Sequence, residues 1–496
     1  MKITGIGIAV SSGEEAIPWP LRDSVVSRRY RPAASLAEMV HHALTECGAR
    51  GPIVLASCNG KVTTWDDDDW RASFELADII DEQAAKVGDA RVLCRAVASA
   101  QCASGMHALY LARALLDAGE PHVTVLAVDI ASAPAHDNFE SLRVLTDDPA
   151  PYTDRSAGFQ LGEGTVALRL SRKAFGGVGF VGPVLGHDLT DDDAIERCLA
   201  NLIARAELTD TSHLQGNSDP VPQLVVGQGA GPVDADRAEL AAIGKHVPAE
   251  VPVATALANA GHTLGASSLL SVAVAAASCT FAADHFTHDH ARRLLSRRSG
   301  GISTESHVDI DGHGLAASQA LDLRAQAPTA LDGRPLEGLP QRMWRAAAIV
   351  RALGGGCGAV MVGDVVDEPG GRVEPTWGPR SAPPALRDEA LRRIAAEVDA
   401  NRPEHPPDIV VVTLECPLPP AARIGQRILP TSVLEMTPGF IPQLVARAWG
   451  FRGPALCLVG ADPEPLLAAL RKTHERVYRL AIRGMHERDV EWIPRG

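Results

Sequence analysis

A cysteine at the start of a predicted helix is the most chemically informative feature of this sequence. Cys102 lies in segment 98–109, Ala-Ser-Ala-Gln-Cys-Ala-Ser-Gly-Met-His-Ala-Leu, where small residues end a predicted strand and an alanine-rich helix follows at once. The first turn of a helix presents unpaired backbone N–H groups and the positive end of the helix dipole, which stabilise a thiolate and a neighbouring oxyanion. The pattern therefore predicts a cysteine nucleophile that attacks a carbonyl carbon.

Four further glycine-rich segments follow Cys102 and carry polar side chains. They read Asp-Arg-Ser-Ala-Gly-Phe-Gln-Leu-Gly-Glu-Gly-Thr-Val-Ala-Leu at 154–168, Val-Val-Gly-Gln-Gly-Ala-Gly-Pro at 225–232, Asn-Ala-Gly-His-Thr-Leu-Gly-Ala at 259–266 and Leu-Gly-Gly-Gly-Cys-Gly-Ala at 353–359. His262 can donate or exchange a proton near neutral pH. The amide of Gln228 can polarise a carbonyl but cannot act as a base. These residue types suit acyl-group chemistry.

Together the five segments resemble the active-site motifs of the β-ketoacyl synthases, the condensing enzymes of the thiolase superfamily. Segment 98–109 is similar to the family's nucleophile turn, and 154–168 to its Asp-x-x-x-Gly-Phe-x-x-Gly-Glu-Gly segment. Segment 259–266 is similar to the family's Asn-x-Gly-His-x-x-Gly-Ala segment. All five occur in the family's order within about residues 1–365, and ordered matches are more specific than any single motif.

Several side chains depart from the family's motifs. Gln228 stands where the family has a histidine, and Leu257 stands where it has a lysine. The resemblance implies that Glu239 and its neighbour Asp236 thereby lose their expected cationic partner. Gly354 replaces a phenylalanine that gates the acyl pocket, which predicts a wider or ungated acyl site. The position of the family's glycine-loop asparagine is also a glycine.

The resemblance implies the following roles. Cys102 takes the acyl group, His262 aligns the second substrate, and the backbone N–H groups of Cys102 and Gly354 hold the oxyanion. Gln228 has three open interpretations: it stabilises an enolate oxygen, it marks the loss of decarboxylation, or it is a structural residue bonded to the backbone. The substrate pocket is expected to include Phe159, Asn259 and Gly355.

These roles imply an acyltransferase of the β-ketoacyl synthase type. The donor would be a thioester on an acyl carrier protein or coenzyme A, and no cofactor is implied. The second step is either a condensation or acyl transfer to an amine or alcohol, in polyketide, specialised fatty-acid or other secondary metabolism. The family also implies a homodimer, or a heterodimer with another ketosynthase-like chain. The alternative is a non-catalytic subunit that shapes the pocket of an active sister chain.

Composition excludes several other classes of protein. The 496 residues are 46% apolar and 22% charged, as in ordinary globular proteins. The net charge of −14 argues against nucleic acid and anionic membranes as partners. The nine cysteines show no metal-ligand spacing, and the N-terminus enters a predicted strand rather than a signal peptide. We therefore expect a cytoplasmic protein without a metal site.

The elements that must position these residues alternate between apolar strands and amphipathic helices, which predicts a layered α/β fold. The resemblance implies a thiolase-like arrangement, α-β-α-β-α, built from two similar halves. We expect the first half at 1–172, with the nucleophile, and the second at 173–366, with Gln228 and His262. A Pro/Gly-rich linker is expected at 367–384.

Residues 385–496 are expected to form an additional half-domain. Segment 449–458, Trp-Gly-Phe-Arg-Gly-Pro-Ala-Leu-Cys-Leu, is similar to the stretch that precedes the nucleophile in ketosynthases. When this comparison is extended along the sequence, the position that corresponds to the nucleophile falls at or near Asp462, where there is no thiol. We therefore interpret this region as a degenerate copy of a ketosynthase N-terminal half.

Overall fold

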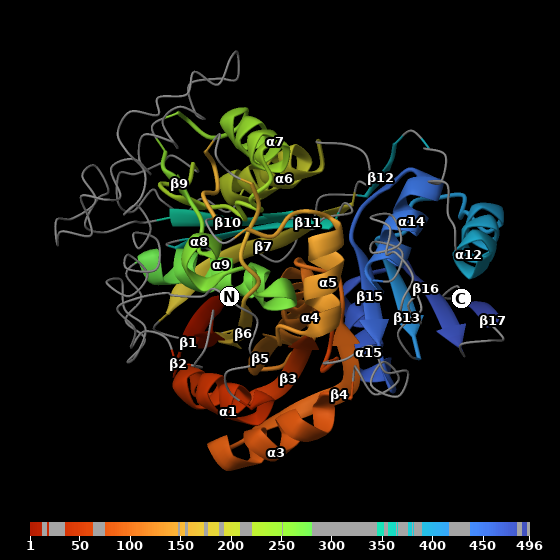
Figure 1. The fold of residues 1–496 in the computed structure, drawn as a ribbon. Helices are drawn as coiled ribbons and strands as arrows, with labels where there is room; N and C mark the ends of the chain where they lie inside the picture. The colour runs from red at the N-terminus through yellow and green to blue at the C-terminus, as the bar shows by residue number, and fades with distance from the viewer. Residues whose placement is uncertain are drawn as a thin grey trace.

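The computed structural model shows three groups of strands with helices packed around them (Figure 1). It describes residues 1–11, 17–18, 35–62, 75–146, 149–153, 157–172, 177–187, 193–208, 221–249, 251–279, 345–351, 356–363, 365, 375–378, 380, 389–415, 437–483 and 489–493.

The first group of strands precedes and follows Cys102. Its order across the sheet is β4 (Ala90–Ala98), β3 (Gly51–Ala56), β5 (His122–Asp129), β6 (Glu163–Ser171) and β1 (Lys2–Ser11), with the short β2 (Ile17–Pro18) on β1. Strands β4, β3 and β5 are parallel, and β6 runs antiparallel to β5 and β1. The helices of this part are α1 (Leu36–Cys47), α3 (Ala77–Val87), α4 (Ser104–Asp117) and α5 (Ala133–Ser141).

The second group has the same strand order when the strands of each group are counted along the chain, leaving out β2: third, second, fourth, fifth and first. Its strands are β9 (Val253–Ala254), β8 (Val225–Val226), β10 (Arg345–Arg351), β11 (Gly356–Gly363) and β7 (Val178–His187). The helices are α6 (Asp193–Leu208), α7 (Val233–Gly244), α8 (Leu257–Ala260), the 3-10 turn η2 (Leu264–Ala266) and α9 (Ser267–Ser278). Because β8, β9 and β10 are parallel while β11 is antiparallel, the strand directions also match those of the first group.

Helices α4 and α9 form the layer between the two groups of strands (Figure 1). All twelve residues of α9 are buried, and most are Ala, Ser or Val. Small side chains let the two helices approach closely: a Cβ atom on Gly105 would lie 2.9 Å from the Cβ of Leu269. Helices α6 and α7 cover one outer face, and α1 and α3 cover the other (Figure 1). The layered α/β fold predicted from the sequence is confirmed.

The third group continues the sheet beyond β4. Its strands are β15 (Ala455–Val459), β13 (Ile409–Leu414), β16 (Val477–Arg483) and β17 (Asp489–Ile493), in that order. Its helices are α12 (Glu389–Ala400), α14 (Phe440–Trp449) and α15 (Glu464–Thr473). A separate pair, β12 (Thr376–Trp377) and β14 (Phe451–Arg452), joins part of the predicted linker to this C-terminal unit. We call residues 389–493 the C-terminal unit.

Candidate active site

Cys102 lies in a tight turn between β4 and α4. Gln101, the residue before it, has φ +55°, a left-handed conformation that is rare for residues with a side chain. Ser104 secures the turn, since its hydroxyl accepts the N–H of Ala100 at 2.9 Å and donates to the carbonyl of Gln101 at 2.6 Å. The small residues read from the sequence thus form a strained elbow with the thiol at its apex.

The elbow brings Cys102 to His262. The Sγ of Cys102 lies 3.0 Å from the Nε2 of His262, and both residues are almost fully buried. The backbone of His262 is held from both sides, because its N–H donates to Gln160 at 2.7 Å and its carbonyl accepts from Gly162 at 3.1 Å. Two residues distant in sequence therefore meet in a fixed geometry.

The hydrogen bonds of His262 define its tautomer. Burial lowers the pKa of His262 to about 4, so the ring is neutral at pH 7. Its Nδ1 accepts the backbone N–H of Leu264 at 3.3 Å. A neutral imidazole that accepts at Nδ1 carries its proton on Nε2. His262 is therefore a hydrogen-bond donor toward Cys102, or toward a carbonyl oxygen bound beside it, and not a base at this nitrogen.

Two phenylalanines enclose the His262 ring. Phe159 stacks on it with ring centroids 4.5 Å apart and an interplanar angle of 26°. Phe139 of α5 lies 5.7 Å from His262 and packs edge-on against Phe159 at 5.0 Å. These contacts keep the imidazole away from water and fix its orientation. Phe159 was predicted to line the substrate pocket and is here a packing partner of His262, while Phe139 had no motif to identify it.

Asp129 connects the two halves beside the site. Its carboxylate accepts the hydroxyl of Ser57 at 2.8 Å, the N–H groups of Cys58 and Asn59 at 2.8 and 2.9 Å, and the N–H of Gly265 at 2.8 Å. Burial raises the pKa of Asp129 to about 7 despite these donors. No motif in the sequence marks this residue, which holds the loop after β3 against the turn that follows His262.

The loop that carries Gln228 is built on two buried carboxylates. Glu239 accepts the N–H groups of Gln228 and Gly229 at 2.7 and 3.0 Å and the hydroxyl of Tyr152 at 3.0 Å. Asp236 accepts the N–H groups of Tyr152 and Gly231 at 2.7 and 2.9 Å. The family resemblance implied that both carboxylates lose their cationic partner. Backbone N–H groups and a phenol donate to them instead.

The side-chain amide of Gln228 has a hydrogen-bonded oxygen and an unpaired nitrogen among the described residues. Its Oε1 accepts the N–H of Arg351, the last residue of β10, at 2.6 Å. Its Nε2 is buried and has no hydrogen-bond partner among the described residues. An unpaired buried donor costs free energy, which a bound acceptor such as a substrate carbonyl would recover.

The remaining predicted site residues are not placed. Gly354 and Gly355 lie outside the described residues, and of Asn259 only the backbone, in α8, is described. The oxyanion contribution of Gly354 therefore stays a prediction.

The other described cysteines are buried thiols. Burial raises the pKa of Cys47 to about 12 and of Cys94 to about 11, and that of Cys58 also rises well above its usual range. The sulfurs of Cys198, on α6, and Cys357, on β11, lie 3.2 Å apart. High thiol pKa values leave little reactive thiolate, so Cys47, Cys58 and Cys94 do not compete with Cys102 as nucleophiles.

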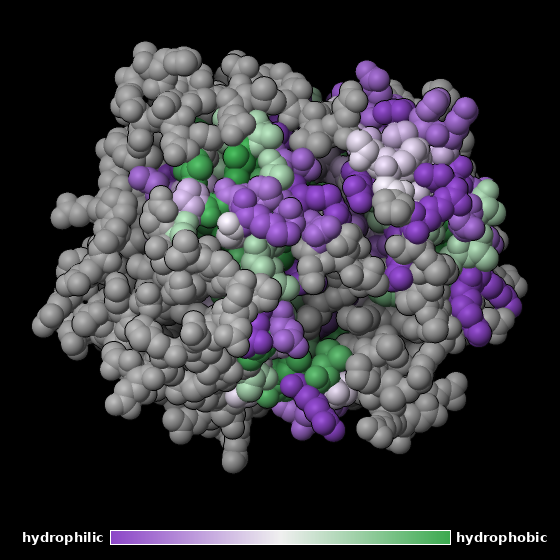
Figure 2. All heavy atoms as spheres, turned by 90° about the horizontal axis from the view of Figure 1, so that it is seen from above, coloured by the Kyte–Doolittle hydropathy of each residue, from purple (hydrophilic) through white to green (hydrophobic). Residues whose placement is uncertain are grey.

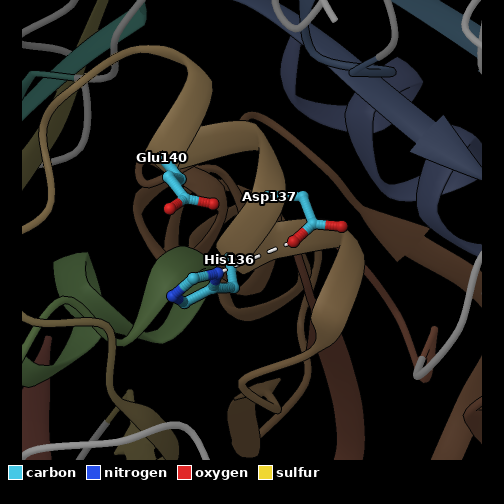
Figure 3. A group of neighbouring side chains, drawn as sticks. All are labelled: His136, Asp137 and Glu140. Carbon is cyan, nitrogen blue, oxygen red and sulfur yellow. Dashed lines mark ion pairs between the residues drawn. The ribbon is translucent and has the colours of Figure 1, made fainter. Parts of the chain in front are cut away.

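One surface group on α5 has residue types that bind metals. The potential ligand atoms of His136, Asp137 and Glu140 lie within 4.8 Å of one another. Figure 3 shows the Nδ1 of His136 turned toward Asp137, at 3.6 Å, with Glu140 one turn along the helix. The side chains of His136 and Asp137 are 40% and 46% exposed, and such groups are common without an ion. We assign no metal site to them.

Comparisons with known proteins bear on the fold. No family model and no curated protein matches the sequence. The PfaC keto synthase-chain length factor structure aligns over 97% of this chain and 74% of its own, with a TM-score of 0.55 and 12% identity. The chain has the thiolase-like fold of the ketosynthases.

Other ketosynthase structures align over less of the chain. A β-ketoacyl synthase from Burkholderia phymatum covers 73% of this chain and 99% of its own, with a TM-score of 0.47 and 15% identity. The oxazolomycin ketosynthase domain OzmH KS7 from Streptomyces albus covers 80% of both chains, with a TM-score of 0.46 and 14% identity. Within the described residues, no helix combines the length and apolar character needed to cross a membrane.

Proposed function

We propose that this chain is a ketosynthase-like acyltransferase in which Cys102 takes an acyl group from a thioester. The contact of 3.0 Å between its Sγ and the Nε2 of His262 carries the proposal. The Cys102 thiol gives up its proton and its sulfur bonds to the thioester carbonyl carbon. The tetrahedral oxyanion then collapses with cleavage of the C–S bond to the donor, and the donor sulfur takes up a proton and leaves as a thiol. The donor is an acyl carrier protein or coenzyme A, and the setting is polyketide, specialised fatty-acid or other secondary metabolism.

For the second step we propose decarboxylative condensation in preference to acyl transfer to an amine or alcohol. An incoming amine or alcohol must lose a proton to a base. His262 already carries its proton on Nε2 and accepts at Nδ1, and Gln228 has no basic group. A malonyl thioester that loses carbon dioxide forms an enolate without a base. That enolate attacks the acyl carbonyl and displaces Cys102, while N–H donors such as those of His262 and Gln228 stabilise its oxygen.

Intact-protein mass spectrometry after incubation with acyl thioesters of several chain lengths tests the first step. We expect the mass of one acyl group on the wild-type chain and none on Cys102→Ala. Cys58→Ala is the matched control, because Cys58 is a buried neighbour with a raised thiol pKa, and it should still be acylated. An equal load on Cys102→Ala would overturn the assignment. A chain that takes no acyl group from any donor would instead be the non-catalytic partner subunit.

A further inference from the structure

The C-terminal unit pairs with the strand that leads into the nucleophile elbow. Strand β15 runs antiparallel to β4, with Leu458 opposite Ala98 and Val459 opposite Val97. The N–H of Ser99 extends the ladder by donating to the carbonyl of Cys457 at 3.0 Å. Figure 1 shows this unit, in blue, continuing the sheet at the edge where β4 would otherwise end it. An open edge strand is a ready site for pairing with a second chain.

Strand β15 meets β4 in the antiparallel pairing that two copies of one edge strand form across a twofold axis. A shift in residue number that carries Ala98 to Val459 and Val97 to Leu458 compares the two strands residue by residue. Here both sides of the contact belong to one chain.

The same shift carries Gln101 onto Asp462, and the two residues have matching left-handed backbones, with φ +55° and +56°. The elbow is thus present in both copies. The same shift makes Pro463 the residue equivalent to Cys102, one position beyond Asp462, which the sequence comparison had suggested. Proline has neither a nucleophile nor a backbone N–H, so the second elbow has lost the chemistry and kept the shape.

Polar contacts tie the unit to the residues around Cys102. The Oγ1 of Thr437, ahead of α14, accepts the side-chain amide of Gln101 at 2.8 Å. The hydroxyl of Tyr110, on α4, lies 2.8 Å from the Nε2 of His474. These contacts lie on both sides of the nucleophile in sequence. The C-terminal unit therefore buttresses the elbow and the helix that follows it.

Helix α12 of the C-terminal unit has a polar face that points away from the core. Helix α12 buries Leu391, Ile394 and Val398, whereas Arg392 and Glu397 are exposed. Figure 2 shows mostly hydrophilic surface on its right-hand side, where Figure 1 places this unit. A terminal unit with a polar outer face is what closes a repeated architecture.

We propose that the C-terminal unit is a built-in partner: it takes the place of a second subunit at the β4 edge, and Thr437 is a positioning residue for Cys102. The ketosynthase-like partner expected from the family resemblance is then part of the same chain. The positioning role rests on the function proposed above, since it concerns the same nucleophile. The pairing at β4 does not depend on it.

Alkylation of Cys102 by iodoacetamide, followed by peptide mass spectrometry over a range of pH, tests the role of Thr437 without any acyl substrate. Thr437→Val removes the acceptor for Gln101, and we expect alkylation to slow about tenfold, the factor that a net hydrogen bond of ~1.4 kcal/mol represents. Thr437→Ser keeps the hydroxyl and should restore the rate and its pH profile.

Thr413→Val is the matched control, because Thr413, on β13 of the same unit, accepts a hydrogen bond from the Nε of Arg479 at 3.2 Å and does not contact Gln101. It should react as the wild-type chain does. Equal rates for Thr437→Val and the wild-type chain would overturn the positioning role. If acyl donors fail to react but Thr437→Val still slows alkylation, only the proposed function is wrong.

Light scattering tests the built-in partner. The full chain should have the mass of one copy, 52.3 kDa. A stable particle of twice that mass would overturn the proposal. As a second measurement, Val97→Cys with Val459→Cys should give a disulfide within one chain, since these residues are opposed in the sheet. A disulfide that joins two chains would also contradict it.

Discussion

The hydroxyl of Tyr152 donates to the Oε2 of Glu239 at 3.0 Å, directly beside the loop that carries Gln228. The loop passes so close that a Cβ atom on Gly227 would lie 2.1 Å from the Tyr152 oxygen. A neutral phenol thus stands in for the lysine that the family resemblance led us to expect at Leu257. Without a cation, burial raises the pKa of Glu239 to about 7, with the nearby Asp236 also raising it.

Tyr152→Phe should destabilise the protein, and more so at high pH. A carboxyl whose folded-state pKa is raised contributes less stability as the pH rises toward that pKa, because the folded state must then hold a buried charge. Removing a donor raises this pKa further. We expect a loss of ~1–3 kcal/mol in the free energy of unfolding at pH 8, and less at pH 6, by urea denaturation. Tyr478→Phe, in the C-terminal unit, is the control. A pH-independent loss would contradict the argument.

His262→Ala should slow the second step more than the acylation of Cys102. The reason is the tautomer: Nε2–H donates, so its loss removes stabilisation of a carbonyl oxygen rather than a base for the thiol. Loss of one such donor costs on the order of 10²–10³ in rate. His262→Gln retains an N–H donor and should recover part of it. Single-turnover measurements separate the two steps, and equal loss in both would make His262 the activator of the thiol.

Gln228→Glu separates the two ends of this side chain. A glutamate keeps an oxygen for the N–H of Arg351 but replaces the open Nε2 donor with a second acceptor. We expect the variant to lose stability as the pH rises, because its buried carboxylate must ionise with its second oxygen unpaired, but still to acylate Cys102 and to lose at least tenfold in condensation with a malonyl thioester. Gln228→Ala should lose stability as well. Full condensation by Gln228→Glu would show that the glutamine is purely structural.

The local motif was sufficient to predict a cysteine at a strand-to-helix turn, whereas the proximity of Cys102 and His262 was expected only from the family resemblance. Glycines, small residues and a helix start are properties of adjacent residues, and the family resemblance supplied their spatial relationship. The resemblance implied two similar halves, but not the order of the strands within them. The alternation of apolar strands with helices predicted the layers from residue periodicity alone.

The groups that support the site could not be predicted in this way. Asp129, Tyr152 and Thr437 act on backbone or side-chain atoms far away in the sequence, and nothing in their own neighbourhoods marks them. The donors that replace the lysine at Glu239 could not be predicted for the same reason: a side chain's partner is set by the tertiary fold, and a missing lysine says nothing about which other donor is near. Such partners become visible only when the chain is folded.

His107→Met should stabilise the protein, increasingly so as the pH falls. Both ring nitrogens of His107 are buried without a hydrogen-bond partner among the described residues, and burial followed by the charge of His187 lowers its pKa well below the usual value. Replacing unpaired polar atoms by an apolar side chain of similar size should contribute ~1–2 kcal/mol at pH 7.

The sign of the pH effect follows from proton uptake. The unfolded chain protonates His107 below about pH 6.5, whereas the folded chain does not, so wild-type stability falls by up to ~1.4 kcal/mol per pH unit on acidification through this one group. The advantage of His107→Met should therefore be larger at pH 5 than at pH 7 in thermal or urea unfolding. The same change at the exposed His405 should have little effect at either pH. A destabilised His107→Met would mean that the imidazole has a polar partner.

Asp462→Ala should leave acylation of Cys102 unchanged, because the second elbow has kept only its shape. Asp462 is exposed, and its φ of +56° is the feature that the turn requires. Alanine in this left-handed conformation should cost ~1–2 kcal/mol of stability, while Asp462→Gly removes the steric penalty and should be at least as stable as the wild-type chain. Differential scanning calorimetry and the acylation assay measure the two effects separately. If Asp462→Gly stopped acylation in a folded protein, the second elbow would have chemistry of its own.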